Sequence, residues 1–415
     1  MSETTAIRMA KRSHTTLLVV GAAVAWAVGA WFLTRTSVPS LHLSGLDERR
    51  LFSAHALHRS ADYSRGVQLL WLAGTLSGLA ALAVLVWRLP RSIRGMGLGR
   101  IASAIVAGVV LLVTLWFVGL PFGLAQLWWD HHYGLGPFDV FAWLNSQWAL
   151  LGIEVASAML TIVLLVGFAG KWPRGWWLLT APTIVAIAAA FAFVEGWAAA
   201  AGTNPVLDPQ LRSDVVRIEQ AEHVSGTPVR VQDVSSWTSQ ANAFTTGYGP
   251  STHVVLWNTL LDGRFSRGEI DVVIAHELGH VRSRHVLKAI GWSALVVLPT
   301  LWIVAVVTRR RGGIADPANL PLAVFVLAVL ALLTAPLQNA VSRRYEAEAD
   351  WRALNATRDP ASDQKLFQAF GKTSLEEPDP PLLDYLWLEN HPTLMQRIAM
   401  AQQWRKRHPG LRPAR

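Results

Sequence analysis

The sequence of 415 residues contains no cysteine and has little charge. Without cysteine, the chain can have no disulfide framework, no thiol nucleophile and no cysteine ligand for a metal. Only 16% of the residues are charged and 52% are hydrophobic, whereas about 25% of the residues of a soluble domain are charged. This composition excludes an ordinary soluble domain and indicates a membrane protein.

Seven long apolar runs predict several membrane spans, because about 20 apolar residues cross a bilayer as a helix. The expected spans are residues 15–34, 67–87, 101–124, 148–168, 176–197, 289–307 and 320–337. Basic residues precede the first run, as in a signal peptide. That run exceeds the roughly 7 to 15 residues of a signal core, however, and no clear cleavage site follows it. We therefore predict a mainly α-helical bundle of seven retained spans.

The basic residues favour lipid over nucleic acid as a partner. The formal net charge is +9, but the Lys and Arg residues are scattered at the ends of the expected spans. Since they form no basic stripe interleaved with aromatic residues, we exclude nucleic acid. Anionic membrane lipid is the expected partner, and the sequence gives no indication of an oligomeric state.

The distribution of Lys and Arg also predicts the orientation in the membrane, because cytoplasmic loops are enriched in both. The segments on the N-terminal side hold twelve: Arg8, Lys11, Arg12, Arg88, Arg91, Arg94, Arg100, Lys171, Arg174, Arg309, Arg310 and Arg311. The short loops on the other side hold five, all between the first two spans. We therefore expect a multi-pass protein of the cell membrane, with a cytoplasmic N-terminus and an extracytoplasmic polar domain.

Four parts follow from the positions of the spans. Residues 1–200 form a five-span membrane domain, 201–288 a first polar part, 289–337 a two-span hairpin and 338–415 a second polar part. Two crossings return the chain to the side on which it started, so both polar parts face the same side. They are expected to build one α+β domain that is split around the hairpin.

The first polar part contains the motif HELGH. Residues four apart share one face of a helix, so His276 and His280 can present two imidazoles to one metal ion. Glu277 then lies beside the metal, where it can take a proton from water. His285 lies off this face of the helix and is expected either at the surface or behind a ligand.

The residues around this motif support a folded site. Ser266 and Glu269 form a capping box that begins the helix, and Gly279 lets another element approach closely. Upstream, the β-rich runs NAFTTG and HVVLWN flank a turn at Gly249 and Pro250 and predict a hairpin.

A catalytic zinc has three protein ligands and an open position, so a third ligand is needed. Glu346 is the best candidate, since it follows the seventh span on the same side as the histidines. Asp350 lies on the same helical face and can orient a ligand imidazole, whereas Glu348 points the other way. The alternative is a charged helix face on which Arg343 and Arg344 pair with these carboxylates.

Together these motifs resemble the type I CAAX prenyl proteases, which are multi-spanning zinc metalloproteases of the gluzincin type. The resemblance rests on HELGH, on NAVSRRYEAEAD, on ANAF with VVLWNTLL before the metal helix, and on HPTLMQRI near the end. It also includes the seven spans and the segment LPFGLAQLWWDHHYGLGPFDVF after the third span, so it covers nearly the whole chain.

The resemblance implies one Zn²⁺ per chain, bound by His276, His280 and Glu346, with Glu277 as the catalytic base. The expected function is that of a membrane-embedded zinc metalloendopeptidase, a hydrolase that cleaves peptide bonds with zinc-activated water. One alternative is a quality-control protease of the heat-shock type, although seven spans disfavour its architecture. Another is a transporter or scaffold with a structural metal site, which normally has four ligands.

The resemblance further implies that the peptide substrate binds as an extended strand along ANAF, with Asn242 near the scissile bond. His391 and Arg397 would then lie close enough to stabilise an oxyanion. The residues alone also allow Asn242 as a turn residue and HPTL as a helix start. Family members with seven spans enclose a water-filled chamber, which Glu154 and Glu195 can line; exposure at the membrane interface explains both equally well.

Overall fold

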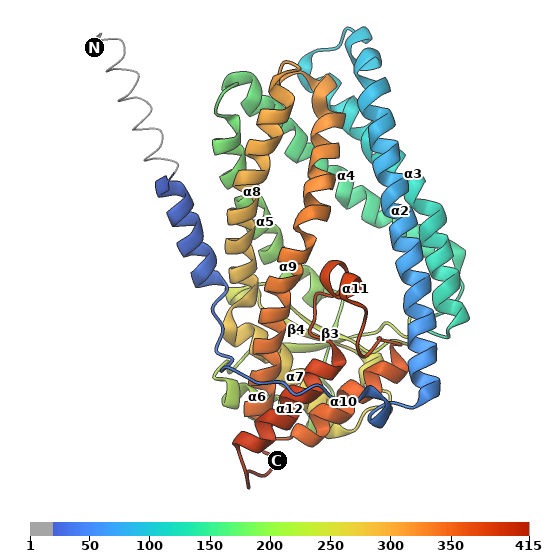
Figure 1. Cartoon of the computed structure of the whole chain (residues 1–415), viewed down its shortest axis with the longest axis vertical. Coiled ribbons are helices and arrows are strands. Elements are labelled where there is room, and N and C mark those ends of the chain that lie inside the picture. Colours follow the sequence, from blue (N-terminus) through green and yellow to red (C-terminus); the bar gives the residue numbers. More distant parts are fainter. Residues whose placement is uncertain (1–19, 415) are drawn as a thin grey trace.

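Long helices stand beside one another and a smaller α+β domain lies at one end of them (Figure 1). The structure is a computed structural model that describes residues 20–414, except for the side chains of residues 148–151, 153 and 154. The long helices are α2 (Ala54–Gly95), α3 (Arg100–His132), α4 (Val140–Lys171), α5 (Trp176–Ala201), α8 (His285–Arg309) and α9 (Leu320–Thr357). A shorter apolar helix, Val20–Leu33, packs on α8, where the Trp26 indole donates to the Leu295 carbonyl at 2.9 Å.

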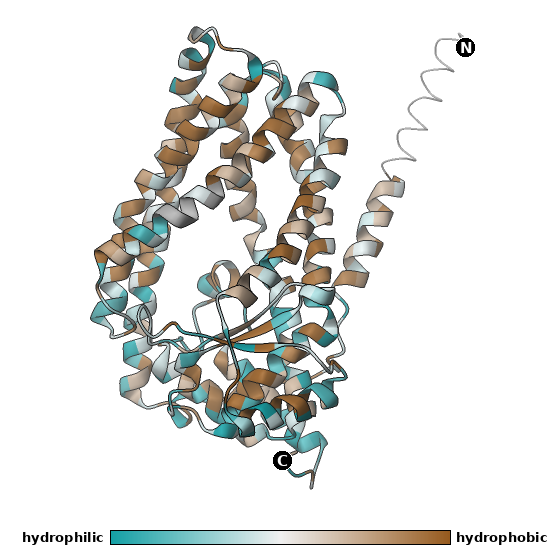
Figure 2. Ribbon diagram, turned by 180° about the vertical axis from the view of Figure 1, so that it is seen from behind, coloured by the Kyte–Doolittle hydropathy of each residue, from teal (hydrophilic) through white to brown (hydrophobic). Residues whose placement is uncertain are grey.

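Among residues 20–414, five helices are long and apolar enough to cross a bilayer, namely α2, α3, α5, α8 and α9. Figure 2 shows hydrophobic residues along the bundle and hydrophilic residues gathered in the α+β domain and the distal loops. The two other predicted spans coincide with shorter apolar stretches of the described residues, Val20–Leu33 and Val155–Lys171. A mainly helical membrane bundle is confirmed, whereas the count of seven spans is not. Part of the first predicted span, residues 15–19, lies outside the described residues.

The loops that join α2 to α3, α4 to α5, and α8 to α9 lie at the end of the bundle opposite the α+β domain (Figure 1). Arg94 near the end of α2 pairs with Asp316 beyond α8, with 2.7 Å between the guanidinium and the carboxylate. The three of these basic segments that lie within the described residues, those after α2, α4 and α8, are therefore at one end of the molecule.

The α+β domain has a small sheet and several short helices. Its strands are β1 (Asn204–Pro205), β2 (Val229–Gln232), β3 (Ala243–Thr246) and β4 (His253–Trp257), in the order β1-β2-β4-β3. Strand β3 pairs antiparallel with β4, which confirms the predicted hairpin, and forms the edge of the sheet. The helices are α6 (Pro209–Glu222), α7 (Arg267–Ser283), α10 (Pro360–Thr373), α11 (Leu382–Trp387) and α12 (Leu394–Arg407).

Helix α7 begins and ends with clear local signals. The Glu269 carboxylate accepts a hydrogen bond of 2.6 Å from the Ser266 backbone N–H, as the capping box predicts. At the other end, Arg284 has φ 55°, a left-handed conformation that ends α7, and α8 begins at the next residue. Ile274 and Leu278 face inward from α7 and pack in the domain core with Leu256 of β4.

Helix α9 runs without a break from its apolar half into the α+β domain, where it packs along α7. Gly279 of α7 lies against Ala349 of α9. A Cβ added to Gly279 would lie 3.3 Å from the Ala349 Cα and 3.2 Å from the Arg352 Cβ, closer than the roughly 3.5–4.0 Å of ordinary carbon contacts. The predicted close approach at this glycine is therefore present, and it joins α7 to a membrane helix.

Candidate metal centre

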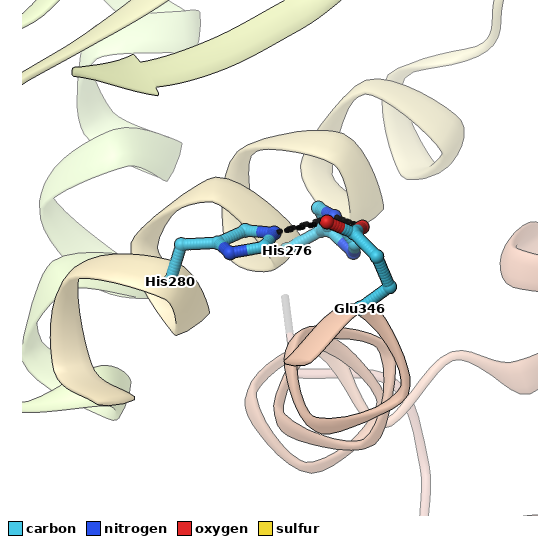
Figure 3. Close-up of side chains that lie close together, drawn as sticks. All are labelled: His276, His280 and Glu346. Carbon is cyan, nitrogen blue, oxygen red and sulfur yellow. Dashed lines mark hydrogen bonds and ion pairs between the residues drawn. The ribbon is translucent and has the colours of Figure 1, made fainter. Parts of the chain in front are cut away.

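Two imidazoles and one carboxylate converge between α7 and α9. His276 and His280 project from one face of α7, and Glu346 faces them from α9 (Figure 3). The His276 Nε2 lies 3.0 Å from the His280 Nε2 and 3.2 Å from the Glu346 Oε2. The His280 Nε2 lies 3.6 Å from the Glu346 Oε1. The structure thus brings the three predicted metal ligands together.

These three side chains fit a divalent cation. The two Nε2 atoms face each other, an arrangement that favours a positive charge between them. Burial alone would lower the pKa of His276, but hydrogen bonds to Asp350 and Glu346, with their charges, raise it to about 10. The Glu346 Oε2 is buried without a hydrogen bond of good geometry, although the Nε2 atoms of His276 and His391 each lie 3.2 Å away. A metal ion held by His276, His280 and Glu346 would satisfy these groups.

Asp350 supports His276 from behind. The His276 Nδ1 lies 2.8 Å from the Asp350 Oδ1, and the side chain of Asp350 is 3% exposed. Arg397 holds the same carboxylate with two hydrogen bonds, 2.9 Å from Nε to Oδ2 and 2.6 Å from Nη2 to Oδ1. Burial acts to lower the pKa of Arg397, but the charge of Asp350 has the larger effect, so the pKa is raised. Glu346 and Asp350 therefore do not form the alternative considered above, a charged helix face that pairs with Arg343 and Arg344. Arg343 donates instead to the backbone carbonyls of residues 385 and 389.

Glu277 is fixed by a residue that the sequence analysis did not identify. The Thr245 hydroxyl lies 2.9 Å from both the Glu277 Oε2 and the Glu277 carbonyl oxygen, and can donate to either. Thr245 lies on β3, two residues after Ala243, so both side chains point to the same face of the strand. That alternation, together with the edge position of β3, is the signal that could have identified it.

The remaining predicted residues lie around the same cluster. His391 precedes α12 and reaches the Glu346 Oε2, and its pKa is raised because Glu346 outweighs the effect of burial. Asn242 is exposed at the start of β3, where its Oδ1 accepts from the Ala243 N–H at 2.8 Å. Both residues line a cavity of about 100 Å³ with His276, Glu277 and Arg397. Glu195 is exposed on α5, and the side chain of Glu154 lies outside the described residues, so the chamber stays a prediction.

A groove runs along β3 past these side chains. It measures about 410 Å³ and is lined by residues of β3, by Glu277 and by the three candidate ligands. A further hollow of about 620 Å³ continues from Thr245 and His280 toward Tyr248 and Arg284. The unpaired edge of the sheet therefore borders two adjoining hollows, and the first of them holds the metal cluster of His276, His280 and Glu346.

His285 lies behind His280 and is buried, so it is not a surface residue. Its Nδ1 lies 2.8 Å from the His280 Nδ1, and its Nε2 lies 3.1 Å from the Glu348 Oε2. An uninterrupted helix would have carried His285 away from the ligand face. The left-handed Arg284 turns the chain and brings the imidazole back.

Known proteins resemble the chain over much of its length. The profile of peptidase family M48 matches residues 205–405. The metalloprotease YhfN of Bacillus subtilis, described as uncharacterized, is 25% identical over 65% of this chain and 66% of its own length. A protease HtpX homologue of Acidiphilium cryptum is 32% identical over 45% of this chain and 68% of its own length.

The crystal structure of Ste24p from S. mikatae has the same fold. It aligns with a TM-score of 0.68 over 91% of this chain and 96% of the Ste24p chain, at 19% sequence identity. The matched length thus includes the membrane helices as well as the α+β domain. The chain belongs to peptidase family M48 and is a multi-pass membrane metalloprotease with the Ste24p fold.

Proposed function

We propose that the protein is a zinc endopeptidase that binds one Zn²⁺ through His276, His280 and Glu346. The observation that carries this proposal is the convergence of these side chains, with Glu277 beside them, in a groove next to an exposed strand edge. Three ligands and an adjacent carboxylate are typical of a catalytic zinc. The same features disfavour a structural metal in a transporter or scaffold.

The protein side chains have separate tasks in the proposed reaction. When bound, zinc supplies a Lewis acid that polarises a carbonyl and lowers the pKa of water to about 7. Glu277 accepts the proton of the attacking water and passes it to the departing amine. The Thr245 hydroxyl, 2.9 Å from the Glu277 Oε2, holds that carboxylate in place.

Strand β3 is suited to bind the substrate as an added strand. The Trp257 N–H donates to the Asn242 carbonyl oxygen at 3.0 Å, so Asn242 directs this group toward β4. Hydrogen-bonding direction alternates along an antiparallel strand, and Ala243 and Thr245 therefore turn their backbone groups to the groove. We propose that an extended peptide pairs with these two residues.

Asn242, His391 and Arg397 complete the proposed active site. Asn242 and His391 line the groove with Glu277, where they can hydrogen-bond to the scissile peptide and its developing oxyanion. The contacts of Arg397 favour a different task, because its guanidinium holds Asp350, which in turn orients His276. We assign the metalloprotease domain that carries this site to residues 201–288 and 338–415.

Two substitutions separate catalysis from metal binding. Glu277→Gln removes the base but no ligand, so the purified protein should retain one zinc and lose about 10² to 10⁴-fold in kcat. Glu346→Ala removes a ligand and should lower the zinc content itself. Metal analysis and hydrolysis of a fluorogenic peptide measure both effects, with chelated and zinc-restored wild-type enzyme as the control. Full zinc occupancy in Glu346→Ala would overturn the choice of third ligand.

The HtpX relatives support a second candidate function, quality control of membrane proteins. The two candidates differ in substrate, because quality control acts on many damaged proteins whereas CAAX-type processing acts on few defined C-termini. Membrane fractions of cells with active enzyme and with Glu277→Gln can be compared by proteomics. We expect a few proteins with discrete uncut forms in the Glu277→Gln cells. Broad accumulation of unrelated membrane proteins would favour quality control instead.

We also propose that the metal centre faces away from the cytoplasm. The basic loops lie at the end of the molecule opposite the metal centre, and basic loops favour the cytoplasmic side. Alkaline phosphatase fused after Arg415 should therefore be active in a bacterial host. The matched fusion after Arg311 should be inactive, whereas a fluorescent reporter there should be bright. The reverse pattern contradicts this orientation.

A further inference from the structure

The support of His280 differs from that of His276. His276 contacts a carboxylate directly, since its Nδ1 lies 2.8 Å from the Asp350 Oδ1. His280 contacts a second imidazole, that of His285, and Glu348 lies beyond that ring. The metal cluster therefore has two unlike supports, one on each imidazole.

The direction of each hydrogen bond in the series His280–His285–Glu348 follows from its last member, Glu348. A backbone N–H and an ammonium group hold the Glu348 carboxylate: Ser37 N–H donates to Oε1 at 2.7 Å and Lys288 Nζ to Oε2 at 3.0 Å. An ionised carboxylate only accepts, so His285 donates through Nε2. In a neutral ring the other nitrogen is an acceptor, and His285 Nδ1 thus accepts from the His280 Nδ1–H. This leaves the lone pair of His280 Nε2 directed at Glu346 and the metal cluster.

The His285 ring is also held in place by packing. Its side chain is 6% exposed, and that of Glu348 is 4% exposed. The ring stacks on Tyr345 at a centroid distance of 4.7 Å and an interplanar angle of 14°. The left-handed Arg284 sets the start of α8 so that this stack forms. Each ring nitrogen of His285 has one partner, and neither faces the metal cluster, so His285 is not a fourth ligand.

We propose that His285 and Glu348 are positioning residues that fix the ring orientation and tautomer of His280 for zinc. The inference rests on the proposed zinc site and extends it by a relay from Glu348 through His285 to His280. Partners of this kind typically contribute 10 to 100-fold to metal affinity. A residue that only stabilised the fold would change the melting temperature of the metal-free protein and leave its zinc affinity unchanged.

The test compares zinc affinity with stability in the full-length protein. His285→Phe keeps a flat ring for stacking on Tyr345 but has no acceptor for His280. We expect its zinc dissociation constant, measured by competition with a chromogenic chelator, to rise about 10 to 100-fold, with little change in the melting temperature of the metal-free protein. His285→Asn places an amide oxygen near the former Nδ1 and should restore most of the affinity.

Tyr345→Phe is the matched control, because it retains the stacked ring and loses only the hydroxyl that donates to the Leu33 carbonyl at 2.8 Å. Its zinc affinity should equal that of the wild type. A His285→Phe affinity within twofold of the wild type overturns the inference, as does a Tyr345→Phe protein that is equally weakened. If His285→Phe does not fold, Glu348→Gln decides: weaker zinc binding supports the relay, and wild-type affinity contradicts it. A wild-type protein that binds no zinc refutes the proposed function itself.

Discussion

The packing of α7 on α9 is the contact on which the candidate metal centre depends. Helix α7 carries two imidazoles and helix α9 carries the facing carboxylate, so the distance between these helices sets the size of the metal cluster. Gly279 permits that distance, because its missing side chain leaves room for Ala349. Since α9 continues into the helical bundle without a break, the same contact also fixes the position of the candidate metal centre relative to the apolar helices.

Much of this site could be predicted from the sequence because it depends on local periodicity. The spacing of His276 and His280 places them on one helical face, and the capping box at Ser266 begins that helix where expected. Predicting the third candidate ligand required the topology of the chain as well. Two crossings return the chain to the same side, so Glu346 could be assigned although it lies 66 residues beyond His280.

Other features depend on conformation or on tertiary contacts that no local pattern encodes. Arg284 adopts a left-handed conformation more typical of glycine, so the return of His285 toward His280 could not be predicted. Thr245 contacts Glu277 only because the edge strand lies along α7. The contact of Arg397 with Asp350 depends on how α12 packs on α9. Among residues 20–414, five of the seven predicted spans coincide with helices that are long and apolar enough to cross a bilayer.

The most direct test of this account is the zinc affinity of Gly279→Val. Its side chain would enter the space of Ala349 and Arg352 and push α7 away from α9. The control is Gly78→Val in α2, a helical glycine whose added Cβ has nothing within 4 Å. We predict that zinc affinity falls at least about tenfold in Gly279→Val, similar to the loss of a supporting residue, and is unchanged in Gly78→Val. A folded Gly279→Val protein with wild-type zinc affinity would contradict the claim that the α7–α9 distance sets the metal centre.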